Sequence, residues 1–136
     1  MKVVVDTNVL VSGFLNPYGP PGSIVGLAAS GDLTLCYDAR ILAEYREVLL
    51  RPKFELDAAA ADDFLAQIEA EGEPVAAAPL PRHLPDRSDE PFLEVALSAG
   101  AECLVTGNGT HFPSRLCLGM KVLSPAEFLE AFRKRP

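Results

Sequence analysis

The feature that most constrains the fold is the alternation of short apolar runs with segments of helical periodicity. The runs predict buried strands at 3–5, 33–37, 102–106 and 121–123. Helical patterns follow them, at 24–29, 39–50, 57–70, 88–99 and 125–133. Strands that alternate with helices build a parallel sheet covered on both faces. We therefore expect an α/β fold, a three-layer α/β/α sandwich with a central, mainly parallel sheet, in a single domain over residues 1–136.

Turn-forming residues set the expected boundaries between these elements. Asp6-Thr7-Asn8 predicts a turn directly after the first strand. The stretch 16–22, rich in Pro and Gly, predicts a loop before a helix that Ser23 caps. The stretch 72–85 predicts a connector with one short strand near 75–78.

The charge balance excludes one simple class of function. Nineteen Asp and Glu against twelve Lys and Arg give a formal net charge of −7. A protein that binds nucleic acid through a broad basic surface would have the opposite balance. A nuclease that reaches phosphate through bound cations is compatible with it, and so is ordinary solubility charge.

The cysteines and the lengths of the apolar runs indicate in which cellular compartment the protein is expected. Cys36, Cys103 and Cys117 are odd in number and widely spaced, which argues against a disulfide framework or a zinc knuckle. No apolar run reaches the length of a signal peptide core or a membrane span. We expect a protein of the reducing cytoplasm that has no membrane partner.

Two carboxylates stand out by their positions. Asp6 ends the first strand, at the sheet edge where parallel α/β folds bind ligands. Glu44 lies at the margin of the apolar stripe of the helix that Asp38 caps, whereas Glu47 falls on the opposite, solvated side. Each also has a structural interpretation, Asp6 as a turn or cap residue and Glu44 as a rim side chain that reaches water.

Asp89 departs furthest from the pattern of a surface acid. It precedes Phe92 and Leu93 by three and four residues and so faces the core side of its helix, while Glu90 and Glu94 point outward. A buried, unpaired carboxylate costs several kcal/mol or gives up its charge, so a positive group should compensate it. Capping of the first helical turn is the alternative role.

Carboxylates from three segments at one sheet edge form the kind of site that holds Mg²⁺ or Mn²⁺. The residues after the strand at 102–106 should reach the same edge, where the amide of Asn108 and the hydroxyl of Thr106 can orient metal-bound water. An ordinary Asn-Gly turn is the alternative for Asn108. His111 is a candidate for contacting phosphate, although a lone histidine is more often structural or exposed.

Four fragments together resemble the PIN-domain ribonucleases, and the likeness covers nearly the whole chain. They are Val4-Val5-Asp6-Thr7-Asn8-Val9-Leu10, Ile41-Leu42-Ala43-Glu44-Tyr45, Asp89-Glu90-Pro91-Phe92-Leu93-Glu94-Val95-Ala96 and Leu104-Val105-Thr106-Gly107-Asn108. The stretches from Thr106 to Pro113 and from Leu50 to Phe54 are similar to a subgroup regarded as the toxins of type II toxin–antitoxin pairs.

The resemblance implies a metal-dependent endoribonuclease that prefers single strands. It implies Mg²⁺ or Mn²⁺ as the cofactor, RNA as the substrate, an antitoxin protein as a partner of the toxin subgroup, and a homodimer. The family's metal-site acids map to Asp6, Glu44 and Asp89. The expected reaction is hydrolysis of an RNA phosphodiester by a water molecule that the metal activates.

One position departs from the family pattern. A fourth family acid often sits where this chain has Asn108, and an amide brings no negative charge, so one or two metal ions remain compatible with the sequence. Asp86, three residues before Asp89, is a candidate substitute and otherwise a turn former. Asn8, in the first fragment, is a further candidate that supports the site, together with Thr106, Asp86 and His111.

Two other function classes remain open. A non-catalytic binding module of the same fold is favoured by Asn108. An aspartate-based phosphatase or receiver domain also places an Asp after its first strand. The phosphatases need a second Asp two residues later, where this chain has Asn8, and receiver domains need a Lys that the segment after Val105 does not supply.

Overall fold

Within residues 1–135, which the computed structural model describes, the chain forms a five-stranded sheet in which every strand is parallel to its neighbours. The strands are β1 (Lys2–Val5), β2 (Thr34–Tyr37), β3 (Glu73–Pro74), β4 (Cys103–Val105) and β5 (Val122–Leu123), in the order β3-β2-β1-β4-β5. In the central strand β1, Val3 pairs with Leu35 on one side and Val4 with Leu104 on the other. These side chains are buried on both faces, which explains their continuous apolar runs.

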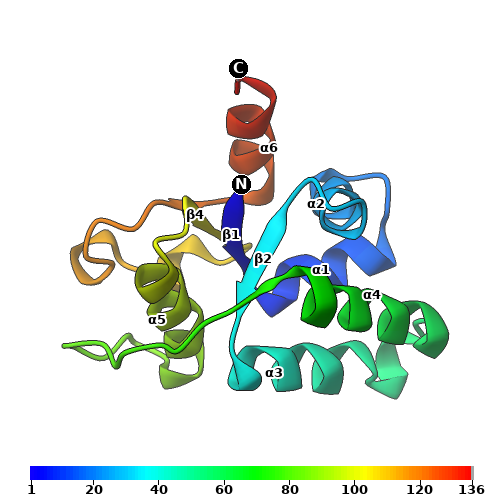
Figure 1. Ribbon diagram of the computed structural model, residues 1–136, viewed down its shortest axis with the longest axis horizontal. Coiled ribbons are helices and arrows are strands. Elements are labelled where there is room, and N and C mark those ends of the chain that lie inside the picture. The colour runs from blue at the N-terminus through cyan, green and yellow to red at the C-terminus, as the bar shows by residue number, and fades with distance from the viewer. Residues whose placement is uncertain (136) are drawn as a thin grey trace.

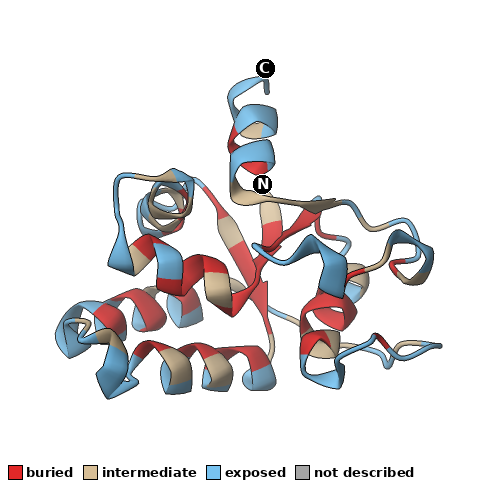
Figure 2. Cartoon of the chain, turned by 180° about the vertical axis from the view of Figure 1, so that it is seen from behind, coloured by how far each residue is buried: buried red, intermediate tan, exposed pale blue. Residues whose placement is uncertain are grey.

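Helices cover both faces of this sheet. Residues 1–135 contain six α-helices: α1 (Thr7–Leu15), α2 (Pro20–Ala29), α3 (Ala39–Leu49), α4 (Ala58–Glu71), α5 (Glu90–Ala99) and α6 (Pro125–Arg133). Helix α5 packs across β1, β2 and β4, and α1, α2 and α4 lie on the opposite side (Figure 1). The buried residues gather along the strands and on the inward sides of the helices (Figure 2). The predicted three-layer α/β/α architecture is confirmed.

Four short 3₁₀ helices complete the described secondary structure, at Pro52–Phe54, Arg87–Asp89, Gly109–His111 and Ser114–Leu116. Among the described residues, no helix combines the length and the apolar character that crossing a bilayer requires.

Several predicted helix ends are confirmed by their local chemistry. The Asp38 side chain accepts a hydrogen bond from the Ile41 amide at 3.0 Å and begins α3. Gly100 ends α5 in the left-handed region, with φ of 62°, where a side chain would be strained. Ser124 and Glu127 form a reciprocal capping box at the start of α6.

The segment after β1 is a helix, and its prediction as a turn is wrong. Asp6 is the N-cap residue of α1, which begins at Thr7. The helix buries Val9, Leu10 and Val11, and it packs against α2 and α3. Because it is apolar on most sides, it lacks the polar stripe by which periodicity identifies a helix.

Two boundaries also differ from the prediction. Helix α2 begins at Pro20 rather than after Ser23, since proline is well suited to the first helical position, and the loop shortens accordingly. The short strand of the connector is Glu73–Pro74 rather than 75–78, and it pairs with Cys36 and Tyr37. As an edge strand it accommodates a proline, which sequence patterns count against a strand.

The strand order places a ligand-binding edge between β1 and β4. From β1 the chain moves outward to β2 and β3, and it then returns to the other side of β1 to form β4 and β5. In parallel α/β sheets, ligands bind beyond the carboxyl ends of the strands at the point where this direction reverses. Here those ends carry Asp6 after β1 and Thr106 after β4.

Candidate active site

A network of polar side chains joins the carboxyl ends of β1 and β4. The Thr106 hydroxyl donates to Oδ2 of Asp6 at 2.8 Å and accepts a hydrogen bond from the backbone N–H of Asn108 at 3.0 Å. Asn8 bridges the strand ends, because its Oδ1 accepts from the Gly107 amide at 3.2 Å while its Nδ2 lies 3.4 Å from Oδ2 of Asp6. Asp6 and Thr106 are buried. The network therefore fixes the Asp6 carboxylate at the point where the strand order reverses.

Glu44 reaches the same region from α3. Its side chain is half-buried at the edge of the apolar face, as predicted, and Glu47 is exposed. The Thr7 hydroxyl donates to Oε2 of Glu44, which ties it to the first turn of α1 beside Asp6. The next residue, Tyr45, is fully buried and donates its hydroxyl to the Val5 carbonyl at the end of β1.

Asp89 lies at the start of α5 with its carboxylate turned inward. It occupies the N-cap position but accepts no capping hydrogen bond, so the capping alternative does not explain it. Its Oδ2 is buried and lies 3.2 Å from Nδ1 of His111, yet it makes no hydrogen bond within the described residues. Asp86, by contrast, accepts from the amide and hydroxyl of Ser88 at 2.9 and 2.7 Å, which is the turn-forming role.

The prediction that Glu90 and Glu94 point to solvent is wrong. Glu94 is buried, pairs with Arg40 at 2.8 Å and accepts from the Leu80 amide at 3.1 Å. Glu90 accepts from the Leu84 amide at 2.9 Å. Both carboxylates hold the 72–85 connector over the outer side of α5, a tertiary contact that helical periodicity does not register.

The buried carboxylates lack full electrostatic compensation. Burial raises the pKa of Asp6; the hydrogen bond from Thr106 opposes this rise and the charge of Asp89 adds to it. Burial likewise raises the pKa of Asp89, although neighbouring His111 lowers it, and nearby carboxylates including Glu44 push it further up. A cation at this edge would relieve both the desolvation and the repulsion.

The oxygen atoms at this edge suit a divalent cation that keeps several water ligands more than one that protein side chains coordinate completely. In the described part of the chain, no three His, Cys, Asp or Glu side chains are grouped closely enough to form a ready-made metal site. The groups at the edge are nonetheless carboxylates, and Oδ2 of Asp89 is buried without a hydrogen bond. Mg²⁺ retains several waters and needs only one or two direct carboxylates, so these residues fit it.

The raised pKa of Asp6 predicts how stability depends on pH. A carboxyl group with a higher pKa in the folded state stabilises the fold below its unfolded value of 3.8, and this contribution is lost as pH rises through the folded pKa. Asp6→Asn removes the charge and keeps the shape. We expect its melting temperature, measured with EDTA, to exceed that of the wild type by a margin that widens to a few degrees between about pH 4 and about pH 7. Exposed Asp62→Asn is the control, and a margin that narrows with rising pH would contradict the expectation.

Comparison with known proteins identifies the family. A family model described as the PIN domain matches residues 2–110. The chain belongs to the PIN-domain family. The match includes every candidate residue named above except His111. A search of curated proteins found no match. PIN domains are generally nucleases, which agrees with an acidic edge at the point where the strand order reverses.

The structure adds one residue of this PIN domain to which the sequence assigned no role. Thr7 orients Glu44, although the two residues lie 37 positions apart. Its position directly after Asp6 was visible in the sequence. The direction of its hydroxyl depends on α1, the helix that periodicity missed.

Proposed function

We propose that this PIN domain is a Mg²⁺- or Mn²⁺-dependent endoribonuclease, a single catalytic domain whose metal-site acids are Asp6, Glu44 and Asp89. The observation that carries the proposal is the Asp89 carboxylate, which is buried, has the half-exposed imidazole of His111 beside its Oδ2 at 3.2 Å and raises the pKa of Asp6 across the edge. Retaining such a group costs stability unless a ligand uses it. The net charge of −7 further favours contact with phosphate through a cation.

The surrounding side chains have separable roles in this proposal. A bound divalent cation supplies a water ligand of lowered pKa and neutralises charge on the phosphate. Thr106 and Thr7 hold the carboxylates of Asp6 and Glu44 in place through their hydroxyl groups. Asn8 and Asn108 present amides that orient water or substrate.

His111 is the imidazole side chain beside Asp89. Its Nδ1 faces Oδ2 of that carboxylate at 3.2 Å, and its side chain is about half exposed. In this position the imidazole can donate a hydrogen bond to a phosphate oxygen while it restrains Asp89.

Asn108 and Asn8 bear on the two alternative function classes. A non-catalytic module is favoured by Asn108, because an amide there removes one carboxylate of the family pattern. Calorimetric titration with Mn²⁺ separates the two, since a non-catalytic site would show no binding that depends on Asp6 and Asp89. The phosphatase class has less support, because the Asn8 amide is engaged with Gly107 where an acid would be needed.

The resemblance to the toxin subgroup extends the proposal to a cytoplasmic toxin with an antitoxin partner. A segment of the partner that carries Arg or Lys would neutralise the acidic edge and exclude RNA from it. A homodimer of the domain belongs to the same extension. A synthetic peptide rich in Arg and Lys tests whether such a segment can occupy the edge, and suppression of RNA cleavage by it, but not by a neutral peptide of the same length, is the expected result.

Removal of the metal and of one carboxylate tests the nuclease directly. We expect a fluorescein-labelled single-stranded RNA to be cut in Mn²⁺ and to stay intact in EDTA. Glu44→Gln should slow cleavage by about 10- to 100-fold, because it weakens metal binding. Glu47→Gln, on the exposed side of the same helix, should cut at the wild-type rate. Cleavage that persists in EDTA, or equal loss in both variants, would contradict the proposal.

A further inference from the structure

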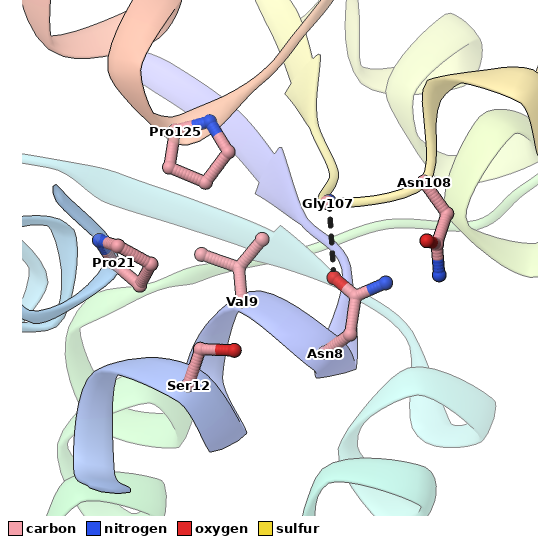
Figure 3. A pocket seen from close by; sticks show the side chains of 7 residues that line it. All are labelled: Asn8, Val9, Ser12, Pro21, Gly107, Asn108 and Pro125. Atoms are coloured by element: carbon pink, nitrogen blue, oxygen red, sulfur yellow. Dashed lines mark hydrogen bonds between the residues drawn. The ribbon is translucent and has the colours of Figure 1, made fainter. Parts of the chain in front are cut away.

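A pocket of about 200 Å³ opens beside the acidic edge. It lies where α1, α2, the start of α6 and the loop after β4 meet (Figure 3). Its lining residues are Asn8, Val9, Ser12, Pro21, Gly107, Asn108 and Pro125. Pro125 lies outside the residues that match the family model, so one wall is contributed by the C-terminal part of this chain.

The lining has a polar side and an apolar side, and it carries no charged residue. The amides of Asn8 and Asn108 lie on one side, the rings of Pro21 and Pro125 lie opposite, and the hydroxyl of Ser12 lies between them (Figure 3). An amide side chain has two N–H donors and an acceptor oxygen. In Asn8 the oxygen accepts from Gly107 and the nitrogen lies near Asp6, which leaves one N–H and one lone pair for the edge of a heterocycle. Because Lys and Arg are absent from the lining, the pocket is poorly suited to a phosphate.

Asn8 connects the pocket to the acidic edge. Its amide lines the pocket, while its Nδ2 lies 3.4 Å from Oδ2 of Asp6. A group bound in the pocket is therefore a single residue away from the carboxylate expected to hold the metal. This separation suits a base attached to the ribose next to a phosphate at the edge.

We propose that this pocket binds one unpaired nucleobase of an RNA strand, beside the phosphate at the acidic edge; the inference rests on the proposed nuclease function. The base contacts the amides with its polar edge, and its ring packs against Pro21 and Pro125. The pocket is smaller than the roughly 300–1,000 Å³ typical of larger ligands, so it holds a single base. A base enters it only when unstacked, which selects single-stranded RNA.

The first experiment measures binding without cleavage. The wild-type protein in EDTA is titrated with the four nucleoside 5′-monophosphates and, separately, with ribose 5-phosphate, which lacks only the base. We expect the side-chain amide signals of Asn8 and Asn108 in NMR spectra to shift with at least one nucleotide and not with ribose 5-phosphate. Equal shifts with both probes, or no shifts, would overturn the inference.

The second experiment measures base preference during cleavage, using a pool of single-stranded RNA and sequencing of the product ends. Ser12→Phe places a ring at the pocket mouth, and exposed Ser23→Phe on α2 is the matched control. We expect a base preference beside the cut that Ser12→Phe reduces by about tenfold, within the energy of one base contact, and Ser23→Phe retains. Thermal unfolding verifies that both variants are folded.

The two experiments separate failure of the pocket from failure of the nuclease. RNA cleavage whose base preference survives Ser12→Phe leaves the nuclease intact and overturns the pocket. Nucleotide-specific amide shifts without any RNA cleavage overturn the proposed function and retain the pocket as a nucleotide site.

Discussion

Asp89→Asn is expected to reduce metal-dependent RNA cleavage by at least about a hundredfold while the domain stays folded. The substitution replaces one carboxylate oxygen with an NH₂ group and removes the charge that raises the pKa of Asp6. The variant should therefore bind the cation more weakly, because the site has one negative charge fewer. Because a buried charge is removed and none is created, the free energy of unfolding should not fall.

The measurement compares initial cleavage rates at saturating Mn²⁺ with calorimetric Mn²⁺ binding and thermal unfolding of the same preparations. Asp62→Asn, an exposed acid on α4, is the matched control and should behave as the wild type. A folded Asp89→Asn variant that cleaves at the wild-type rate would remove this residue from the site. A variant that unfolds would instead show that the carboxylate has a structural role.

Local sequence chemistry predicted the elements that depend on one segment at a time. Helix α3 follows from an Asp38 cap and an apolar stripe, and the position of Glu44 at its margin follows from the same geometry. Asp6 at the end of β1 and the inward direction of Asp89 were likewise predictable. These features need only the periods of helices and strands and the strand-end rule for ligand sites.

Features that depend on contacts between distant segments were not predictable from one sequence. Glu94 has the spacing of a surface acid, but the 72–85 connector folds over it, and the backbone amide of Leu80 in that connector donates a hydrogen bond to it. The opposition of His111 to Asp89, and the pocket between α1 and α6, also require the tertiary arrangement. The periodicity of a helix indicates which of its faces is apolar, but it does not indicate which other segment of the chain packs on that helix.

Two glycines of α2 are expected to respond in opposite directions to the same substitution. A Cβ added at Gly22 would overlap the backbone carbonyl group of Pro17, whereas a Cβ at Gly26 would meet nothing within 4 Å. Gly22→Ala should therefore lower the free energy of unfolding by about 1–3 kcal/mol, since backbone cannot yield as a side chain does. Gly26→Ala should raise it by about 0.5–1 kcal/mol, because alanine loses less conformational freedom in a helix.

Chemical denaturation of the two variants measures this difference, and the pocket gives it a functional consequence. Gly22 follows Pro21, a wall of the proposed base pocket, so displacing the start of α2 should also weaken base preference in RNA cleavage. Gly26, one turn further along the helix, should leave that preference unchanged. Equal unfolding free energies in the two variants would mean that the chain before α2 adjusts freely, and α2 would then not hold the pocket wall in a fixed position.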